Sequence, residues 1–448
     1  MSEYFIRSTM LDAKQAPKSN VGIVGWLQKN VFSSPLNIIL TVVGLFVSYM
    51  TIKALADFVF FNAVFDATNG QECRPADGEP GGACWSFIQV FFKQYVYGRY
   101  PTEELWRPDI VFILGAALLI PLLIPKAPFK VVNSFLFFVI YPFLTLILLS
   151  GGDFVITGFF IPFIDLFGKT QGNFIFELSI VTALICAAIY FFGKSVGEDM
   201  KSTMLSIVVV AVIIAVIGLM LSSNFGLEVI ETDIWGGFLV TLVVAITGIV
   251  LSLPIGIILA LGRQSKLPVI KFLCVVFIEF WRGVPLITIL FMAQNMIPLF
   301  LPEGGEAVDN LLRALIGVTL FASAYMAEVV RGGLQALPKG QYEGAQSLGL
   351  TYWQMMVKII LPQALKHVIP GIVNTFIGLF KDTTLVYIVG IFDLLGTVKA
   401  TIENPEWIFP LQAMTGYVFV AFVFFIFCFG MSRYSIFMER HLHTGHSR

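Results

Sequence analysis

The stretch "PKGQYEGAQSLGLTYWQMMVKIILPQAL", Pro338–Leu365, is a polar insert in a chain whose other segments are strongly apolar. Pro338 suits the first turn of a helix, where its missing N–H would have no partner. Gly349 is typical of the left-handed residue that ends a helix. Thr351, followed three residues later by a glutamine, predicts a capping box at the start of a second helix. We expect that helix to end at Pro362, so the insert is predicted as two short helices joined by a glycine corner.

The composition of the whole chain is that of an integral membrane protein. Of its 448 residues, 57% are hydrophobic and 13% are charged, whereas soluble domains carry about 25% charged residues. The mean hydropathy is +0.85. The apolar composition indicates that membrane lipid surrounds the chain. A formal net charge of −1 gives no reason to expect a nucleic-acid partner.

Apolar segments long enough to cross a membrane recur along the chain. A helix needs roughly 20 apolar residues to cross a hydrocarbon core of ~30 Å. We predict crossings at approximately 36–56, 108–124, 130–150, 174–192, 204–222, 234–261, 268–298, 310–330, 368–396 and 407–432. The shorter apolar segment 154–167 is interpreted as an interfacial or re-entrant piece. The sequence therefore predicts an all-α integral membrane protein with about ten transmembrane helices.

The charges of the short links predict the orientation of these helices. Lysine and arginine collect in cytoplasmic links, and the links 125–130 and 262–271 carry basic residues without acids. The links 223–233 and 299–309 carry acids without basic residues, so we place them outside. Both chain termini are then predicted to be cytoplasmic, and the loop 57–107 is predicted to be external.

Two of the five cysteines share the predicted external loop. In an oxidising compartment Cys73 and Cys84 would pair as a disulfide; the alternative is two free thiols in a loop rich in glycine and proline. The cysteines are too few and too scattered for a metal cluster. Three of the four histidines crowd the C-terminal tail, where a solvated end is the simpler interpretation, so we expect no metal site and no cofactor.

The insert also carries a spaced set of residues that resembles the signature loop of permease subunits of ATP-binding-cassette (ABC) importers. That pattern is E-A-A, three residues, G, nine residues, then I-x-L-P. The residues in this register are Glu343, Gly344, Ala345, Gly349, Ile359, Leu361 and Pro362. Gly344 stands where alanine is expected, which can loosen the helix by up to ~1 kcal/mol. The physical pattern alone leaves an ordinary ordered loop as the alternative.

Four further stretches resemble the polar amino-acid permeases, a HisM-like family. They are "ALGRQS" at 260–265, "EFWRGVPLI" at 279–287, "YMAEVVRGGLQALPKGQ" at 325–341 and "LFKDTTL" at 379–385. The resemblance covers roughly residues 234–432, and Val284 replaces the usual threonine. The five spans that precede it resemble the extension of the long subunit of general or acidic L-amino-acid importers of Gram-negative bacteria.

The resemblance implies a division of the chain into four segments. They are a cytoplasmic segment 1–35, a membrane extension 36–223 with the external loop 57–107, a permease core 224–432 and a cytoplasmic tail 433–448. The implied core is that of a type I (MetI-like) importer with five spans. Its cytoplasmic coupling loop is expected at 336–365.

The function implied by the resemblance is that of a permease subunit, not of an enzyme, in the bacterial inner membrane. It would carry L-amino acids of a polar, acidic or broad range, such as glutamate, glutamine, aspartate and asparagine. Its implied partners are a separate ATPase, a companion permease in a heterodimer and a periplasmic amino-acid-binding protein. The alternative is an ion-coupled secondary transporter of small polar solutes, which would need no ATPase. A membrane enzyme would need an acid/base or nucleophile set, and no such set stands out.

Polar residues within the predicted spans are the candidates for the substrate path, because they are costly in lipid. Arg282 lies eleven residues beyond Lys271, or ~16 Å at 1.5 Å per residue. Gly283 and Pro285 predict a helix break beside it, which would free backbone groups toward a cavity. A second group lies about a dozen residues beyond a proline in a later span. It consists of Lys381, Asp382, Thr383 and Thr384.

A zwitterionic amino acid needs a cation for its carboxylate and an anion for its ammonium group. Arg282 is the candidate for the carboxylate, and Asp382 and Glu328 are the candidates for the ammonium group. The alternative is that these charges are structural. Glu279 lies three residues before Arg282, Glu328 lies three before Arg331, and such pairs form ion pairs on a helix surface. Lys381 and Asp382 could likewise satisfy each other or a neighbouring helix.

Overall fold

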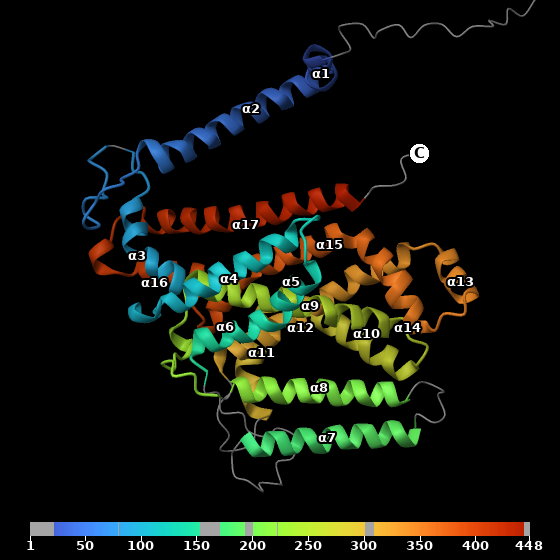
Figure 1. The fold of residues 1–448 in the computed structure, drawn as a ribbon. Coiled ribbons are helices and arrows are strands. Elements are labelled where there is room, and N and C mark those ends of the chain that lie inside the picture. The colour runs from blue at the N-terminus through green and yellow to red at the C-terminus, as the bar shows by residue number, and fades with distance from the viewer. Residues whose placement is uncertain are drawn as a thin grey trace, which may run out of the picture. The chain divides into compact units, whose positions relative to one another are not determined.

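The computed structural model describes most of the chain as helices (Figure 1). The described residues are 22–78, 80–152, 171–192, 200–221, 223–300 and 309–442. Within these ranges the only β-type pairing consists of isolated bridges. The predicted all-α class is therefore confirmed, while the segment 154–167 lies outside the described residues.

The chain forms two compact units, which we describe separately. The first comprises Met1–Gln89 with Pro405–Thr415, and the second comprises Val90–Asn404 with Gly416–Arg448. The second unit therefore holds most of the predicted extension together with most of the predicted core.

The first unit contains α1 (Gly22–Asn30) and α2 (Pro35–Ala56), and α2 ends in a π-helical turn at Asp57–Phe61. The side chain of Ser34 caps α2 by accepting a hydrogen bond from the backbone N–H of Asn37 at 3.2 Å. No residue of α2 is buried, as an apolar helix surrounded by lipid requires.

The remaining helices form or enter the second unit. They are α3 (Trp85–Tyr97), α4 (Trp106–Leu123), α5 (Lys130–Phe135), α6 (Tyr141–Ser150), α7 (Gln171–Phe192), α8 (Met200–Leu221), α9 (Gly237–Arg263), α10 (Pro268–Gly283), α11 (Leu286–Met296), α12 (Asn310–Ala336), α13 (Lys339–Ser347), α14 (Tyr352–Met355), α15 (Leu361–Asp382), α16 (Leu394–Ile402) and α17 (Gln412–Leu442). In the second unit α12 packs against both α9 and α15, and α7 lies beside α8 (Figure 1).

The helices of the predicted extension share a hydrophobic core with those of the predicted permease core. Buried side chains of α4 and α6, such as Val111 and Leu149, belong to the same cluster as Leu239 and Val244 of α9. The side chain of Arg107, 1% exposed, donates a hydrogen bond of 2.7 Å to the carbonyl of Glu228. These contacts explain why the compact unit crosses the boundary at residue 223 that the resemblance implied.

Seven helices in the described residues are long and apolar enough to cross a membrane. They are Pro35–Phe61, Thr102–Leu123, Lys130–Ser150, Gly237–Arg263, Asn310–Ala336, Tyr352–Val389 and Gln412–Leu442. The pair α10 and α11, bent by 107°, would make an eighth. α7 and α8 contain the apolar stretches Leu178–Ala187 and Ile207–Leu221. Every one of the ten predicted crossings overlaps a described helix, but by length and hydropathy seven qualify as spans, or eight with the bent pair, and α7 and α8 contain only the shorter apolar stretches.

The prediction that a helix ends at Pro362 is wrong. A π-helical turn at Met356–Ile360 joins α14 to α15, and Pro362 occupies the first turn of α15. A π-turn shifts the backbone hydrogen bonds from the fourth to the fifth residue back, which accommodates a proline that lacks an N–H. The same arrangement precedes Pro142, after a π-turn at Leu136–Ile140. The polar insert is therefore helically continuous with the next span.

Candidate functional site

The polar insert has the predicted arrangement of two helices around a glycine corner. α13 is followed by Gly349, whose φ of +70° lies in the left-handed region that favours glycine. Thr351 caps α14 because its hydroxyl accepts from the backbone N–H of Gln354 at 3.4 Å. The side chain of Gln354 in turn accepts from the backbone N–H of Thr351 at 3.1 Å. The predicted capping box is confirmed.

The inner side of the insert packs against the membrane helices. Ala345 is 2% exposed and lies in a buried cluster with Leu334 of α12 and Ala364 of α15. The hydroxyl of Tyr342 donates a hydrogen bond of 3.2 Å to the carbonyl of Leu334, and burial raises the pKa of this phenol. The inner side of the insert is therefore in contact with both α12 and α15.

The outer side of the insert is open and partly apolar. Leu348, Trp353 and Val357 are 76%, 60% and 61% exposed, and we call these three residues the docking patch. Glycines at 344 and 349 have no heavy atom within 4 Å of a Cβ built on them. Large apolar side chains exposed on an otherwise polar segment are typical of an interaction surface.

The residues of the signature loop divide between these two sides. Ala345, Ile359 and Leu361 belong to the packed cluster. Glu343, Gly344, Gly349 and Pro362 are exposed. The spacing of the pattern therefore separates residues that fix the insert from residues that a partner can reach.

The second candidate group is a network of charges that we call the arginine cluster. It consists of Arg263 of α9, Glu279 and Arg282 of α10, and Glu328 and Arg331 of α12. Arg263 lies 2.9 Å from Glu279 and 2.8 Å from Glu328, and Arg331 lies 2.6 Å from Glu328. The cluster carries three positive and two negative charges, so one positive charge is in excess.

Arg282 is the loosest member of the arginine cluster. Its guanidinium lies 3.7 Å from Glu328 and 4.0 Å from Glu279, and its side chain is 35% exposed. It also lies over the ring of Tyr325, 5.7 Å from the centroid. Both of the predicted pairs at a spacing of three residues are present, but they belong to a network across three helices.

Arg263 is the member that sequence reasoning missed. It stands in the stretch "ALGRQS", and its position along the chain predicts only a charge of the cytoplasmic link 262–271. Counting along the chain separates Arg282 from Lys271 by ~16 Å, yet its ion-pair partners also bind Arg263, the last residue of α9. Only the packing of α9 against α10 and α12 brings the two arginines to the same acids.

The predicted helix break beside Arg282 is present. α10 ends at Gly283 and α11 begins at Leu286, and the two helices meet at 107°. Pro285 is the residue before α11, and its carbonyl accepts from the N–H groups of Thr288 at 3.0 Å and Ile289 at 3.2 Å. The proline therefore both interrupts one helix and starts the next.

The group Lys381–Thr384 lies where α15 passes into a 3₁₀ turn at Thr383–Val389. The hydroxyls of Thr383 and Thr384 donate to carbonyls of their own helix, Phe380 at 2.8 Å and Lys381 at 2.9 Å. Asp382 is partly buried. Within the described residues, neither Lys381 nor Asp382 has an ion-pair partner within 4.0 Å, and no ion pair joins this group to Arg282.

Cys73 and Cys84 form a disulfide in the first unit, with their Cα atoms 5.8 Å apart. The backbone around it is paired: the N–H of Val64 donates to Ala83 and that of Trp85 donates to Val64, both at 2.8 Å. In the described part of the chain, no group of three or more metal-binding side chains is assembled.

Comparisons with known proteins identify the family of the chain. The family described as "Binding-protein-dependent transport system inner membrane component" matches residues 252–437. The inner membrane amino-acid ABC transporter permease protein YhdY of Escherichia coli (strain K12) is 40% identical, over 94% of this chain and 93% of that protein. The glutamate/glutamine/aspartate/asparagine transport system permease protein BztC of Rhodobacter capsulatus is 42% identical, over 99% of both chains.

A solved structure described as an amino acid ABC transporter with histidines is also similar. It is 28% identical with a TM-score of 0.41, over 46% of this chain and 92% of that chain. The two relatives above cover nearly all of this chain, including the extension, at 40% and 42% identity. The chain therefore belongs to the family of binding-protein-dependent amino-acid ABC transporter permeases.

Proposed function

We propose that this permease is the long subunit of an importer for polar and acidic L-amino acids, working with a companion permease, a separate ATPase and a periplasmic binding protein. The relative BztC is named for glutamate, glutamine, aspartate and asparagine and matches the whole chain, which supports this substrate range. An ion-coupled secondary transporter has no ATPase, so it would not need the exposed surface of the insert.

The observation that carries the proposal is the polar insert with its exposed docking patch. In this proposal the ATPase binds Leu348, Trp353 and Val357, and its movement is transmitted through the packed residues to α12 and α15. The continuity of α14 and α15 through the π-turn supports this transmission, because a helix carries a displacement along its axis without a hinge.

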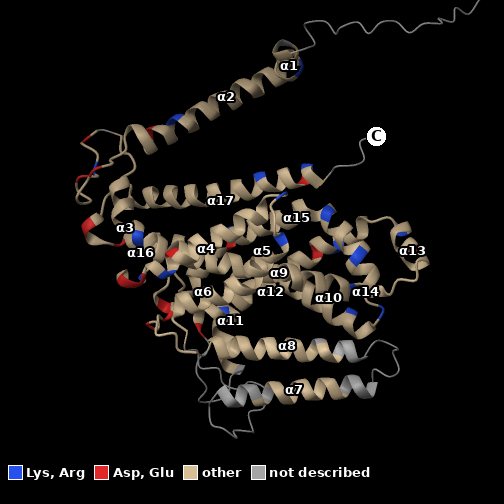
Figure 2. Ribbon diagram, viewed as in Figure 1, with Lys and Arg blue, Asp and Glu red and all other residues tan. Residues whose placement is uncertain are grey.

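The distribution of charge in the second unit supports the proposed orientation. Several Asp and Glu lie around α16 and the link before α9, whereas Lys and Arg are frequent around α13, α14 and α15 (Figure 2). The hydroxyl of Tyr434, near the tail, donates to the carbonyl of Leu123, next to the basic link 125–130, at 3.1 Å. In the proposal the basic end is cytoplasmic, as are both chain termini.

The charges suggest roles within the path. Glu328 is shared by three arginines, so its charge is compensated and it is a weak candidate for binding ammonium. Arg282 retains unused donors and is the candidate for the substrate carboxylate. Asp382, without an ion pair in the described residues, is the better candidate for the ammonium group, and Lys381, Thr383 and Thr384 would shape the surroundings.

The proposed function is tested by reconstituting this chain with its companion permease, ATPase and binding protein in liposomes. ATP-driven uptake of glutamate and glutamine is expected, with much slower uptake of histidine and leucine. Uptake by the purified chain alone, driven by an ion gradient and indifferent to ATP, would refute the proposal.

The docking surface is tested with Glu343→Lys, which reverses an exposed charge beside the docking patch. The ATPase is expected to co-purify at a tenth of the normal yield or less, while the permease stays in the membrane. Glu403→Lys, an equally exposed charge reversal after α16, is the matched control and should retain the ATPase. Normal co-purification and normal stimulated hydrolysis in Glu343→Lys would contradict the prediction.

A further inference from the structure

The last turn of α3 and the residues after it are built into the start of the permease core. Gly98 and Trp235 form a β-bridge, and the N–H of Arg99 donates to the carbonyl of Ile234 at 3.0 Å. A Cβ on Gly237 would lie 2.3 Å from the carbonyl oxygen of Tyr95, so only glycine permits this approach. The extension therefore supplies Arg99 at a fixed place beside α9.

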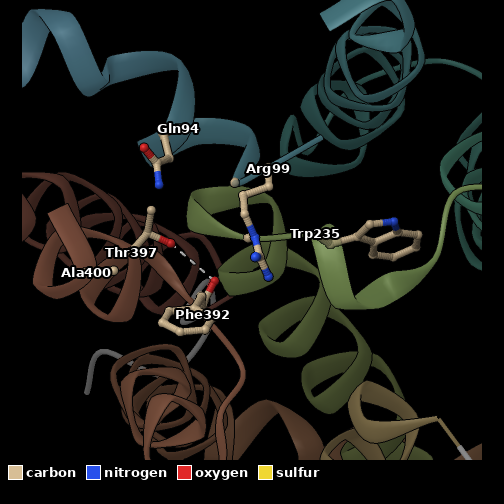
Figure 3. Close-up of a pocket in the computed structure, with 8 residues that line it drawn as sticks. Gln94, Arg99, Trp235, Phe392, Thr397 and Ala400 are labelled. Carbon is tan, nitrogen blue, oxygen red and sulfur yellow. Dashed lines mark hydrogen bonds between the residues drawn. The ribbon is translucent and has the colours of Figure 1, made fainter. Parts of the chain in front are cut away.

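Arg99 lines two cavities in the second unit. Their volumes are about 140 and 250 Å³, and Trp235 and Phe392 also line both. In Figure 3 the side chain of Arg99 extends between Phe392 and Trp235. Such volumes lie below the roughly 300–1,000 Å³ of sites for drug-sized ligands and therefore suit a small solute.

The polar groups around these cavities include unused donors. Arg99 donates one hydrogen bond of 3.2 Å, to the carbonyl of Asp233. It has no ion-pair partner within 4.0 Å among the described residues. Trp235 is 5% exposed, and its indole N–H has no hydrogen-bond partner within the described part of the chain. The guanidinium N–H groups that Arg99 does not use are therefore the donors available to an anionic ligand in these cavities.

The larger cavity also offers oxygen acceptors. Thr232, Asp233 and Asn310 line it, and they come from the link before α9 and from the start of α12. A free amino acid needs partners for both its carboxylate and its ammonium group. The larger cavity offers a guanidinium for the first, and an acid with hydroxyl and amide groups for the second.

We propose that these cavities bind a free amino acid before it enters the substrate path, with Arg99 of the extension binding its carboxylate. The inference rests on the proposed function, since the solute is the imported one, and in the proposed orientation the site lies at the outer end of the second unit. It assigns to the extension a residue of the substrate route that lies outside the permease core.

The test is equilibrium binding of radiolabelled L-glutamine to the assembled permeases and ATPase in nanodiscs, without binding protein or nucleotide. Arg99→Gln is expected to weaken glutamine binding at least tenfold, and Arg99→Lys, which keeps the charge, to recover part of the affinity. Lys93→Gln removes an exposed charge from α3 outside both cavities and should bind like the wild type. Decarboxylated glutamine should compete at least tenfold more weakly than glutamine itself.

Three results would overturn the inference. The first is that the wild-type complex shows no saturable glutamine binding, and the second is that Arg99→Gln and Lys93→Gln bind glutamine with equal affinity. The third is that glutamine binding is lost in Arg282→Ala but kept in Arg99→Gln. Failure of the proposed function has a different readout, the absence of ATP-driven uptake in liposomes, and leaves the equilibrium measurement unaffected.

Discussion

Among the residues of the arginine cluster, Arg282 is the one whose guanidinium makes no hydrogen bond in the described part of the chain. Arg263 and Arg331 bind the shared carboxylate of Glu328 closely, whereas Arg282 remains 3.7 Å away. Because the Arg282 guanidinium has no hydrogen bond to break among the described residues, it can bind an incoming carboxylate at a small cost in free energy. In the proposed function, Arg263 and Arg331 therefore hold the helices together and Arg282 binds the substrate carboxylate.

The first prediction at this scale concerns Arg282→Ala. Because a charge-assisted hydrogen bond contributes about 1.5–3 kcal/mol, the KM for uptake is expected to rise roughly tenfold or more. Co-purification with the ATPase should persist. Lys366→Ala removes an exposed charge of α15 as the control. Uptake kinetics equal to those of the control would remove Arg282 from the substrate path.

The second prediction contrasts the two acids of the cluster. Glu328→Gln leaves three arginines facing one another around a side chain that is 15% exposed. Removing one partner of such a network is expected to cost about 3 kcal/mol. Glu279→Gln, at a side chain 54% exposed, should cost about 1 kcal/mol or less. Thermal unfolding of the purified complex measures both, and equal losses would show that Glu328 does not hold the helices together.

Among the elements, the insert α13–α14 is the one whose local sequence accounts best for its shape. The glycine corner needs a left-handed residue, and the capping box needs only Thr351 and Gln354. The continuation into α15 depends on the next turn, because the π-turn before Pro362 lets the helix run on. The second helix of the insert is thus continuous with α15.

The prediction at the scale of elements concerns the glycine corner. Gly349→Val places a β-branched residue at a φ of +70°, which is expected to cost about 1–3 kcal/mol and to displace α14 from α13. ATPase binding should fall at least tenfold, measured by co-purification at equal permease yield. Gly344→Ala is the control, since its Cβ has open space and alanine favours a helix. A normal ATPase yield with Gly349→Val would show that the corner does not set the docking geometry.

In the whole molecule, the extension does not form a separate body. The part of the extension from Val90 onward belongs to the unit that contains most of the permease core, and α4 and α6 contribute to its buried cluster. The first unit instead combines the loop that contains Cys73 and Cys84 with residues 405–415. A change that lowers the stability of one unit should therefore have little effect on the other.

A prediction at this scale uses the disulfide. It closes a loop with a sequence separation of 11, and opening a loop of this length is expected to cost the first unit up to about 3 kcal/mol. A reductant should accelerate limited proteolysis within residues 57–89, while glutamine uptake by the reconstituted importer changes less. Cys73→Ser should be cleaved rapidly with or without reductant. An equal rate of wild-type proteolysis with and without reductant would refute the prediction.

The sequence by itself determined the features that depend on neighbours along the chain. Apolar runs predicted the crossings, Pro285 predicted the break between α10 and α11, and Gly349 with Thr351 predicted the shape of the insert. Hydropathy, proline chemistry and capping act within one or two turns, so they can be recognised without knowledge of the packing. The spacing of the signature loop likewise pointed to the family.

Only the tertiary structure decided which distant residues meet. Arg263 joins Glu279 and Glu328 because α9 packs against α10 and α12, and Arg99 reaches the cavities because Gly98 lies against the start of α9. The physical reason is that an ion pair or a cavity depends on the separation of atoms in space, whereas sequence patterns record separation along the chain.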